Sequence, residues 1–112
     1  MDSEVEVRNN ALVVRLAGEI DIKVADALRT ELETSLDKSQ AQHLVLNLDR
    51  VSFIDSSGLG VILGRYKRIS SRGGRMAFVG LKPAVKRVLE LSGVLRISEV
   101  FPSEDEALSR LQ

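Results

Sequence analysis

Residues 55–58 read Asp-Ser-Ser-Gly, and these two adjacent hydroxyls between a carboxylate and a glycine are the part of the sequence best suited to chemistry. The apolar run 44–48 precedes them, and the stretch 61–67 follows them. This order predicts a turn that joins a buried strand to a helix, with the hydroxyls at the surface. The active site of another protein could reach them there.

Serine hydrolysis is the first chemistry to test. A serine hydrolase whose nucleophile lies on a strand-to-helix turn needs the pattern Gly-x-Ser-x-Gly and a histidine base. The sequence here is Ile-Asp-Ser-Ser-Gly, and the only histidine is His43. We expect His43 at the far end of the strand that leads to Ser56. Five or six extended residues at about 3.3 Å each would keep the two apart, so we expect a strand-edge histidine and no catalytic residue.

Nucleotide chemistry is the second possibility. The glycines at 58, 60 and 64 miss the Gly-x-Gly-x-x-Gly spacing by one residue, and no Gly-Lys-Ser/Thr phosphate loop occurs. Weak nucleotide contact at this helix start stays an alternative, and a nucleotide hydrolase built on these glycines is the rival from the enzyme class. We expect neither a cofactor nor a metal site of the chain's own.

Acceptance of a phosphoryl group by Ser56 or Ser57 is the third possibility. A helix N-terminus would favour the phosphate, while the neighbouring Asp55 would oppose it. Phosphorylation adds about −1.5 to −2 charges, enough to abolish docking on a partner that covers the turn. The plainer interpretation is that Asp55 or Ser56 caps the helix.

The glycines after the serines also require an explanation, since each costs about 1 kcal/mol relative to alanine inside a helix. For Gly60 and Gly64 the structural explanation, close packing of the helix on the sheet, is as good as a functional one. Gly58 lies beside the hydroxyls, where a missing side chain would admit another backbone or an incoming phosphate.

Composition and length predict one globular domain spanning residues 1–112. The chain is 44% hydrophobic and 29% charged, with sixteen basic residues, sixteen acidic residues and no cysteine. The balance of charge favours binding neither to nucleic acid nor to a membrane surface. The absence of cysteine excludes disulfides and thiolate metal sites. The N-terminus lacks the apolar core of a signal peptide, and no run approaches a membrane span, so we expect a cytoplasmic protein.

Periodicity predicts the elements that hold the turn. Alternating apolar residues on both sides of Asn9-Asn10 indicate a hairpin. Apolar residues then recur every four positions from Val24 to Leu36, which predicts an amphipathic helix whose solvent side carries Asp26, Arg29, Glu31 and Glu33.

A strand at 43–48 and a helix that stops before Gly73-Gly74 should follow, and then a strand at 76–79. Next come a helix begun by Pro83 and ended by Gly93, a strand near 97–101 and a last helix capped by Ser103 with Glu106. The alternation predicts an α/β fold: a small mixed sheet with parallel members and helices packed against it.

Charge is uneven along the chain. Residues 58–98 hold nine Lys or Arg against one acid, Glu90. Solvated helix faces are the ordinary explanation. The alternative is a basic surface beside Ser56 that helps to dock an acidic partner, an effect that salt would weaken.

The stretch from Phe53 to Lys67 resembles the phosphorylation motif of bacterial anti-sigma factor antagonists in the STAS-domain family, and their sporulation member in particular. The resemblance covers nearly the whole chain: 18–21, Gly-Glu-Ile-Asp, is similar to the family's Gly-Glu-Leu-Asp, and 83–93 is similar to its third-helix segment. Ile22-Lys23-Val24 departs from the sporulation member, which has polar residues including histidines there.

The resemblance implies a partner switch in which the chain is a substrate and a binding module, not an enzyme. Unphosphorylated antagonist binds an anti-sigma factor and releases its sigma factor. The anti-sigma factor is also a serine kinase that uses its own ATP to phosphorylate Ser56, and a serine phosphatase restores the active form. Asp21 and Asp55 would line the phosphorylation site and Ser57 would shape the turn, while Leu59 and nearby backbone, Gly58 included, would contact the kinase.

Other roles in the same family are the nearest alternatives. A stress-response antagonist differs only in its partner. A structural member of a signalling complex and the cytoplasmic end of an anion transporter are further possibilities, and the lack of a membrane segment disfavours the transporter.

Overall fold

A computed structural model of the protein describes residues 1–111. In chain order its elements are β1 Asp2–Arg8, β2 Ala11–Ile20, α1 Ile22–Ser39, β3 His43–Ile54, α2 Ser56–Ser71, β4 Met76–Val79, α3 Pro83–Ser92, a short 3-10 helix Val94–Arg96, β5 Glu99–Phe101 and α4 Glu104–Arg110. The strands form one mixed sheet in sequence order, in which β1 is antiparallel to β2 and all other neighbours are parallel. The predicted α/β fold is therefore confirmed.

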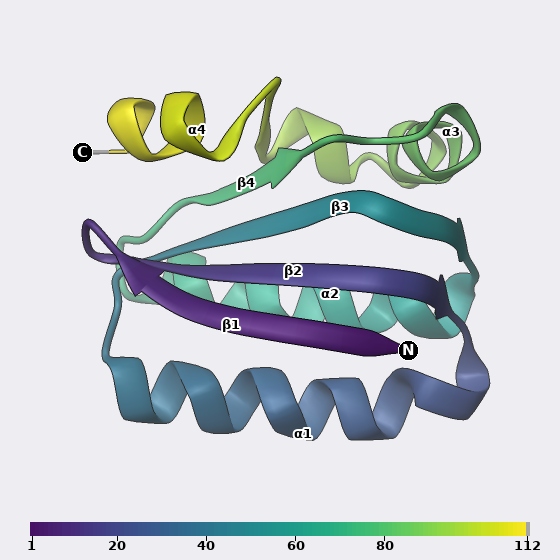
Figure 1. The fold of residues 1–112 in the computed structure, drawn as a ribbon, viewed down its shortest axis with the longest axis horizontal. Helices are drawn as coiled ribbons and strands as arrows, with labels where there is room; N and C mark the ends of the chain where they lie inside the picture. Colours follow the sequence, from purple (N-terminus) through teal and green to yellow (C-terminus); the bar gives the residue numbers. More distant parts are fainter. Residues whose placement is uncertain (112) are drawn as a thin grey trace.

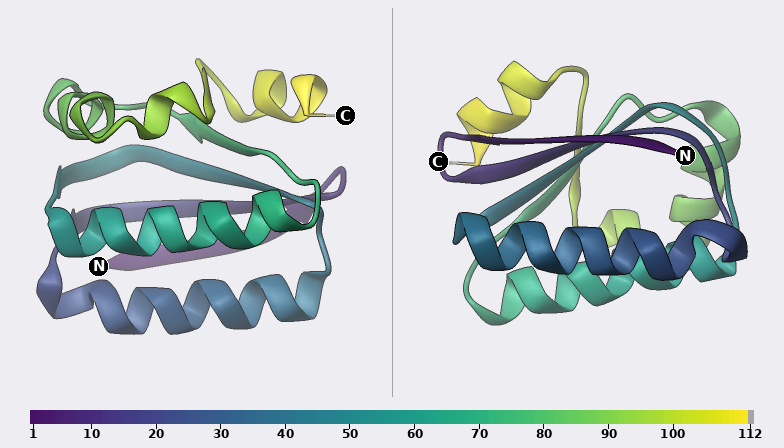
Figure 2. Two further views of the ribbon diagram at one scale, coloured as in Figure 1. Left: turned by 180° about the vertical axis from the view of Figure 1, so that it is seen from behind. Right: turned by 60° about the horizontal axis from the view of Figure 1, so that its bottom comes forward.

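Helices lie on both faces of this sheet. Figure 1 and the right view of Figure 2 show α1 and α2 side by side under one face, with α4 over the other and α3 near the end where β3 finishes. Because the β2–α1–β3 and β3–α2–β4 crossovers join parallel strands, α1 and α2 begin at the same end of the sheet. That end carries the Asp-Ser-Ser-Gly turn.

The hairpin forms as predicted. Asn9 and Asn10 both have positive φ, 49° and 63°, which is the backbone that a two-residue turn between antiparallel strands needs. Asparagine tolerates this region better than most residues because its short side chain can bond locally. The turn therefore fixes the register that brings Val5 opposite Val14.

Strand β3 is longer than the sequence predicted, and it runs to Ile54 instead of Leu48. Its second half buries Leu48, Val51 and Ile54 at every third position. Register shifts in the pairing of β2 with β3 break the alternation that identifies a strand. The correction matters because these extra residues carry the chain directly into the serine turn.

Two apolar cores hold the layers together. The larger one packs one face of the sheet against α1, α2 and α3, with Leu28, Ile62 and Leu89 among its buried residues. The smaller one packs Val13 and Val45 of the other face against α4. The helix faces predicted from periodicity are the buried ones, with one exception described below for Glu33.

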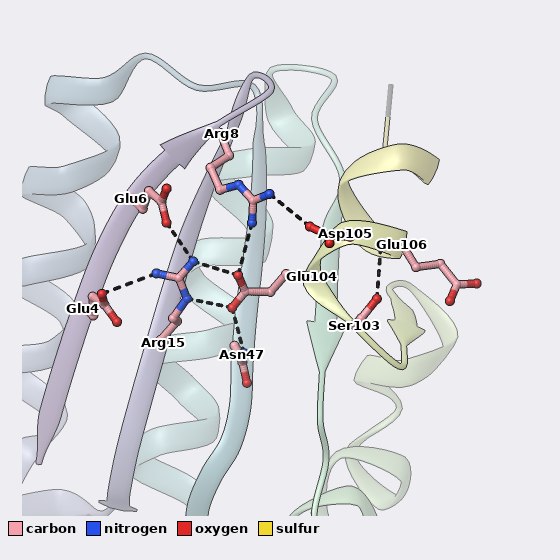
Figure 3. A network of polar contacts seen from close by, with 9 residues as sticks. All are labelled: Glu4, Glu6, Arg8, Arg15, Asn47, Ser103, Glu104, Asp105 and Glu106. Atoms are coloured by element: carbon pink, nitrogen blue, oxygen red, sulfur yellow. Dashed lines mark hydrogen bonds and ion pairs between the residues drawn. The ribbon is translucent and has the colours of Figure 1, made fainter.

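The third and fourth helices begin and end largely as predicted. Pro83 opens α3 and Gly93 ends it in the left-handed region, with φ 84°. Ser103 caps α4 by accepting a hydrogen bond from the amide of Glu106 at 3.2 Å. The Glu106 side chain points away from the cap, so only half of the predicted reciprocal pair forms (Figure 3). The 3-10 turn at 94–96 was not predicted, and it delays the last strand to 99–101.

An ion-pair network ties α4 to the sheet (Figure 3). Arg15 holds Glu104 through Nε and Nη2 at 2.8 and 2.7 Å, and Asn47 donates to the same carboxylate at 2.7 Å. Hydrogen bonding from Arg15 lowers the pKa of Glu104, against the opposing effect of burial. This network lies on the sheet face opposite α1 and α2, so it supports the fold and not the serine turn.

Candidate functional site

The serine turn begins where β3 ends. Asp55 is the N-cap of α2, and its Oδ1 accepts a hydrogen bond from the amide of Gly58 at 3.0 Å. Of the two caps that the sequence allowed, Asp55 is the one used, which leaves Ser56 as the first residue of the helix. Ser56 is exposed and Ser57 is half-buried, and no hydrogen bond found within residues 1–111 uses either hydroxyl.

Asp55 also joins this turn to the start of α1. Its other oxygen, Oδ2, accepts from the amide of Ile22 at 3.2 Å, and its own amide donates to the carbonyl of Ile20 at 3.2 Å. Asp21 caps α1 itself by accepting from the amide of Lys23 at 3.0 Å. The two predicted acidic residues therefore lie at neighbouring helix starts, and both carboxylates bond backbone amides.

Gly58 is buried between the two turns. A Cβ on Gly58 would lie 2.4 Å from the carbonyl oxygen of Ile20 and 2.6 Å from its Cγ2. Of the two approaching groups expected from the sequence, a backbone or a phosphate, the structure shows a backbone, and it belongs to this chain. Contact of Gly58 with a partner stays a prediction, as does contact by Leu59, which is half-buried against the larger core.

Gly60 and Gly64 do not have the packing role considered for them. A Cβ at either position would meet nothing within 4 Å, so neither glycine brings α2 close to the sheet. Within α2 the close approach needs Gly58 alone. Gly60 instead borders an open groove.

This groove lies between α1 and α2 and has a volume of about 470 Å³. Its α2 side consists of Ser56, Ser57, Gly60 and Val61, and its α1 side consists of Ile22, Ala25, Asp26 and Arg29. Both predicted serines thus lie on a surface that is open to solvent, together with α1 residues more than 25 positions earlier in the chain. We call this surface the α1–α2 groove.

His43 lies far from the groove, at the opposite end of the twelve-residue strand β3. It is buried, and its Nδ1 accepts a hydrogen bond from the amide of Arg75 at 3.0 Å. Burial, together with the positive charge of Arg75, lowers the pKa of His43. It is a satisfied structural residue, so it supplies no base for Ser56.

A charged cluster between α1 and α2 was missed at the sequence level. Arg65 is only 8% exposed, and its Nε lies 2.8 Å from Oε1 of Glu33, which was expected to face solvent. Arg68 pairs with both Glu33 and Asp37. Burial lowers the pKa of Arg65, whereas hydrogen bonding to Asp37 raises that of Arg68. In the sequence, Arg65 has the helical spacing of the buried residues Ile62 and Ile69 of α2. A charged residue on an apolar helix face was the signal that could have predicted a buried ion pair.

Two further features bear on function. Two large apolar side chains are open to solvent: Ile22, which lines the groove with Ser56 and is 73% exposed, and Phe53, which comes three residues before Ser56 and is 48% exposed. In the part of the chain that the structure describes, no cluster of acidic, histidine or cysteine side chains could hold a metal ion. No helix there is long and apolar enough to cross a membrane.

Comparison with known proteins now identifies the fold family. The model of the STAS domain matches residues 2–107. This chain belongs to the STAS-domain family. This chain is also 42% identical over 109 residues to the anti-sigma F factor antagonist of Paenibacillus polymyxa. The match covers 97% of this chain and 93% of that protein.

Two solved structures of similar proteins bear on the serine turn. The anti-sigma factor antagonist SpoIIAA in its unphosphorylated form matches with a TM-score of 0.84 at 30% identity, covering 97% of this chain and 95% of that one. The Bacillus cell fate determinant SpoIIAA in the phosphorylated form matches with a TM-score of 0.78 at 28% identity, covering 99% and 100%. This chain is thus similar in fold to an antagonist whose structure was solved in both the unphosphorylated and the phosphorylated form.

Proposed function

We propose that this STAS domain is an anti-sigma factor antagonist controlled by phosphorylation of Ser56. In its unphosphorylated form it binds an anti-sigma factor and so releases the sigma factor held there. Phosphorylation of Ser56 ends that binding. The name of the relative from Paenibacillus polymyxa points to sigma F as the factor concerned.

The observation that carries the proposal is the state of Ser56. Its side chain is exposed on the first turn of α2, and the cap that a serine could have supplied there is supplied by Asp55. Its hydroxyl is therefore not required by the fold. A kinase can modify such a group without first unfolding the turn, and the helix geometry does not depend on it.

The surroundings of Ser56 explain why a phosphate would switch binding off. Ile22 and Phe53 expose apolar surface of the kind that a partner protein buries. Asp21 and Asp55 already place two carboxylates at the neighbouring starts of α1 and α2. A further −1.5 to −2 charges, roughly, would have to be desolvated when the partner closes over this surface.

The chemistry of the switch belongs to the partners. The anti-sigma factor acts as the serine kinase and brings the ATP, and a serine phosphatase removes the phosphate. The antagonist contributes a hydroxyl acceptor and a docking surface, with no cofactor or catalytic residue of its own. Ser57, Gly58 and Leu59 complete that surface as partner-binding residues in the proposal.

The experiment that tests this function is phosphorylation in vitro with site mapping. Purified antagonist is incubated with the anti-sigma factor and ATP, and the product is analysed by mass spectrometry. We expect one phosphate on Ser56, none after Ser56→Ala, and a phosphate still located on Ser56 after the matched change Ser57→Ala. A phosphate located on Ser57 would overturn the assignment. ATP hydrolysis by the antagonist alone, lost in Ser56→Ala, would favour the enzyme alternative.

A further inference from the structure

The α1–α2 groove contains one positively charged side chain, Arg29 of α1. Its described partner is Asp26, three residues earlier on the same helix. The side chains of Arg29 and Asp26 are 49% and 90% exposed, respectively. An ion pair this open to water contributes little to stability, about 0–1 kcal/mol. Arg29 is therefore free to exchange Asp26 for a stronger anionic partner.

Other charges near Arg29 favour such an exchange. Burial lowers the pKa of Arg65, and the positive charges of Arg29 and Arg68 act in the same direction, so Arg29 lies within electrostatic range of other guanidinium groups. Glu33 and Asp37 are occupied by Arg65 and Arg68. Arg29 therefore forms its ion pair with the exposed Asp26.

We propose that Arg29 is the phosphate-binding residue of the phosphorylated form, in which its guanidinium leaves Asp26 and pairs across the α1–α2 groove with a phosphate on Ser56. The inference rests on the proposed function, because it takes Ser56 as the phosphorylated serine. It adds a residue on a different helix, 27 positions earlier in the chain, that recognises the modification.

The geometry of the helix pair supports this contact. Helices α1 and α2 begin at the same end of the sheet and run side by side (Figure 2). Arg29 stands seven residues after Ile22, about 10 Å further along the α1 axis. Side chains on a helix lean toward its N-terminus, so the long arginine side chain leans back toward the end where Ser56 lies. Gly60, whose Cβ would meet nothing within 4 Å, leaves the space between them open.

The energetics point in the same direction. A phosphoserine carries about −1.5 to −2 charges and three acceptor oxygens, so it attracts a guanidinium more strongly than the single charge of Asp26 does. The carboxylates of Asp21 and Asp55 are bonded to amides at the helix starts and repel the phosphate from that side. Arg29 lines the same groove as Ser56 and is the positive charge there.

The test uses the full chain with phosphoserine incorporated at position 56 during translation, so that it depends on no kinase. The pKa of the phosphate is measured by phosphorus NMR titration. We expect Arg29→Gln to raise that pKa by about one pH unit, because an opposite charge within hydrogen-bonding distance is lost. Lys38→Gln, a cation-to-amide change in the last turn of the same helix, serves as the matched control and should leave it unchanged.

A second measurement follows Arg29 itself. The Nε–H signal of Arg29 should shift between the unmodified chain and the chain with phosphoserine at 56. An unchanged phosphate pKa in Arg29→Gln would overturn the proposal, and so would a rise in Lys23→Gln alone, since Lys23 is a cation at the start of α1, next in sequence to Ile22. If the kinase instead modified Ser57, the proposed function would fail while this titration still reported on Arg29.

Discussion

The carboxylate of Asp55 accepts a hydrogen bond from the amide of Ile22 at 3.2 Å, although 33 positions separate the two residues. The same carboxylate caps α2 through Gly58. One side chain therefore satisfies amides at the starts of both α1 and α2, and it fixes the surface around Ser56 that a partner would meet.

This double role makes Asp55 more costly to remove than an ordinary cap. Asp55→Ala should lower the free energy of unfolding by about 2 kcal/mol, because the lost cap of α2 costs about 1 kcal/mol and the Ile22 amide of α1 also loses its acceptor, which costs about as much again. Asp21→Ala, which removes one cap, is the matched comparison and should cost about half as much. Urea unfolding of the two variants measures the difference, and equal losses would contradict the shared cap.

Gly58 and Gly60 should respond in opposite directions to the same change. Gly58→Ala places a methyl group against the Ile20 carbonyl and should destabilise the chain by about 1–3 kcal/mol. Gly60→Ala adds a methyl group in open space within a helix and should stabilise it by up to about 1 kcal/mol. Thermal unfolding of both variants is the measurement. A loss of stability in Gly60→Ala would show that the space beside it is not free.

The Arg15–Glu104 pair predicts a pH-dependent contribution to stability. Folding lowers the pKa of Glu104, so its contribution is fully present above the pKa of the unfolded chain and is lost as the pH falls through the folded-state value. Glu104→Gln should therefore cost about 1.5–3 kcal/mol at pH 7, and this difference from the parent chain should shrink in acid.

The control for this prediction is Glu106→Gln, two residues along the same helix. Its side chain points away from the network (Figure 3), so at pH 7 the variant should not show the loss of stability expected for Glu104→Gln. Denaturant unfolding between about pH 3 and pH 7 brackets the ordinary carboxylate range. A Glu104→Gln effect that stays constant across this range would contradict the assigned charge interaction.

Much of the fold could be predicted because local patterns were strong. Short-range rules predicted three features that the structure confirms: the buried face of α1 with Leu28, Leu32 and Leu36, the Asn9-Asn10 turn, and the end of α3 at Gly93. The end of β3 could not be predicted, since register shifts give its buried residues a spacing of three and not two. The residues alone indicated a turn in which Ser56 or Ser57 could be phosphorylated. The resemblance to the STAS-domain family narrowed the predicted phosphorylation site to Ser56.

The arrangement around the turn could not be predicted because it depends on contacts between distant parts of the chain. Nothing near Asp55 in sequence indicates that it also bonds Ile22. Glu33 has the spacing of a solvent-facing residue on α1, and only the neighbouring α2 brings Arg65 and Arg68 to it. Arg29 joins the groove for the same reason, through the packing of two helices that begin at one end of the sheet.

In the proposed switch, a negative charge at Ser56 cancels binding to the anti-sigma factor. The most direct test is calorimetric titration of the anti-sigma factor with four forms of the chain: the parent, Ser56→Ala, Ser56→Asp and the chain carrying phosphoserine at 56. We expect the parent and Ser56→Ala to bind equally well, Ser56→Asp to bind poorly, and the phosphorylated chain to bind at least ~100-fold more weakly, a loss of about 2.7 kcal/mol. Equal affinity of Ser56→Ala and the phosphorylated chain would contradict the account.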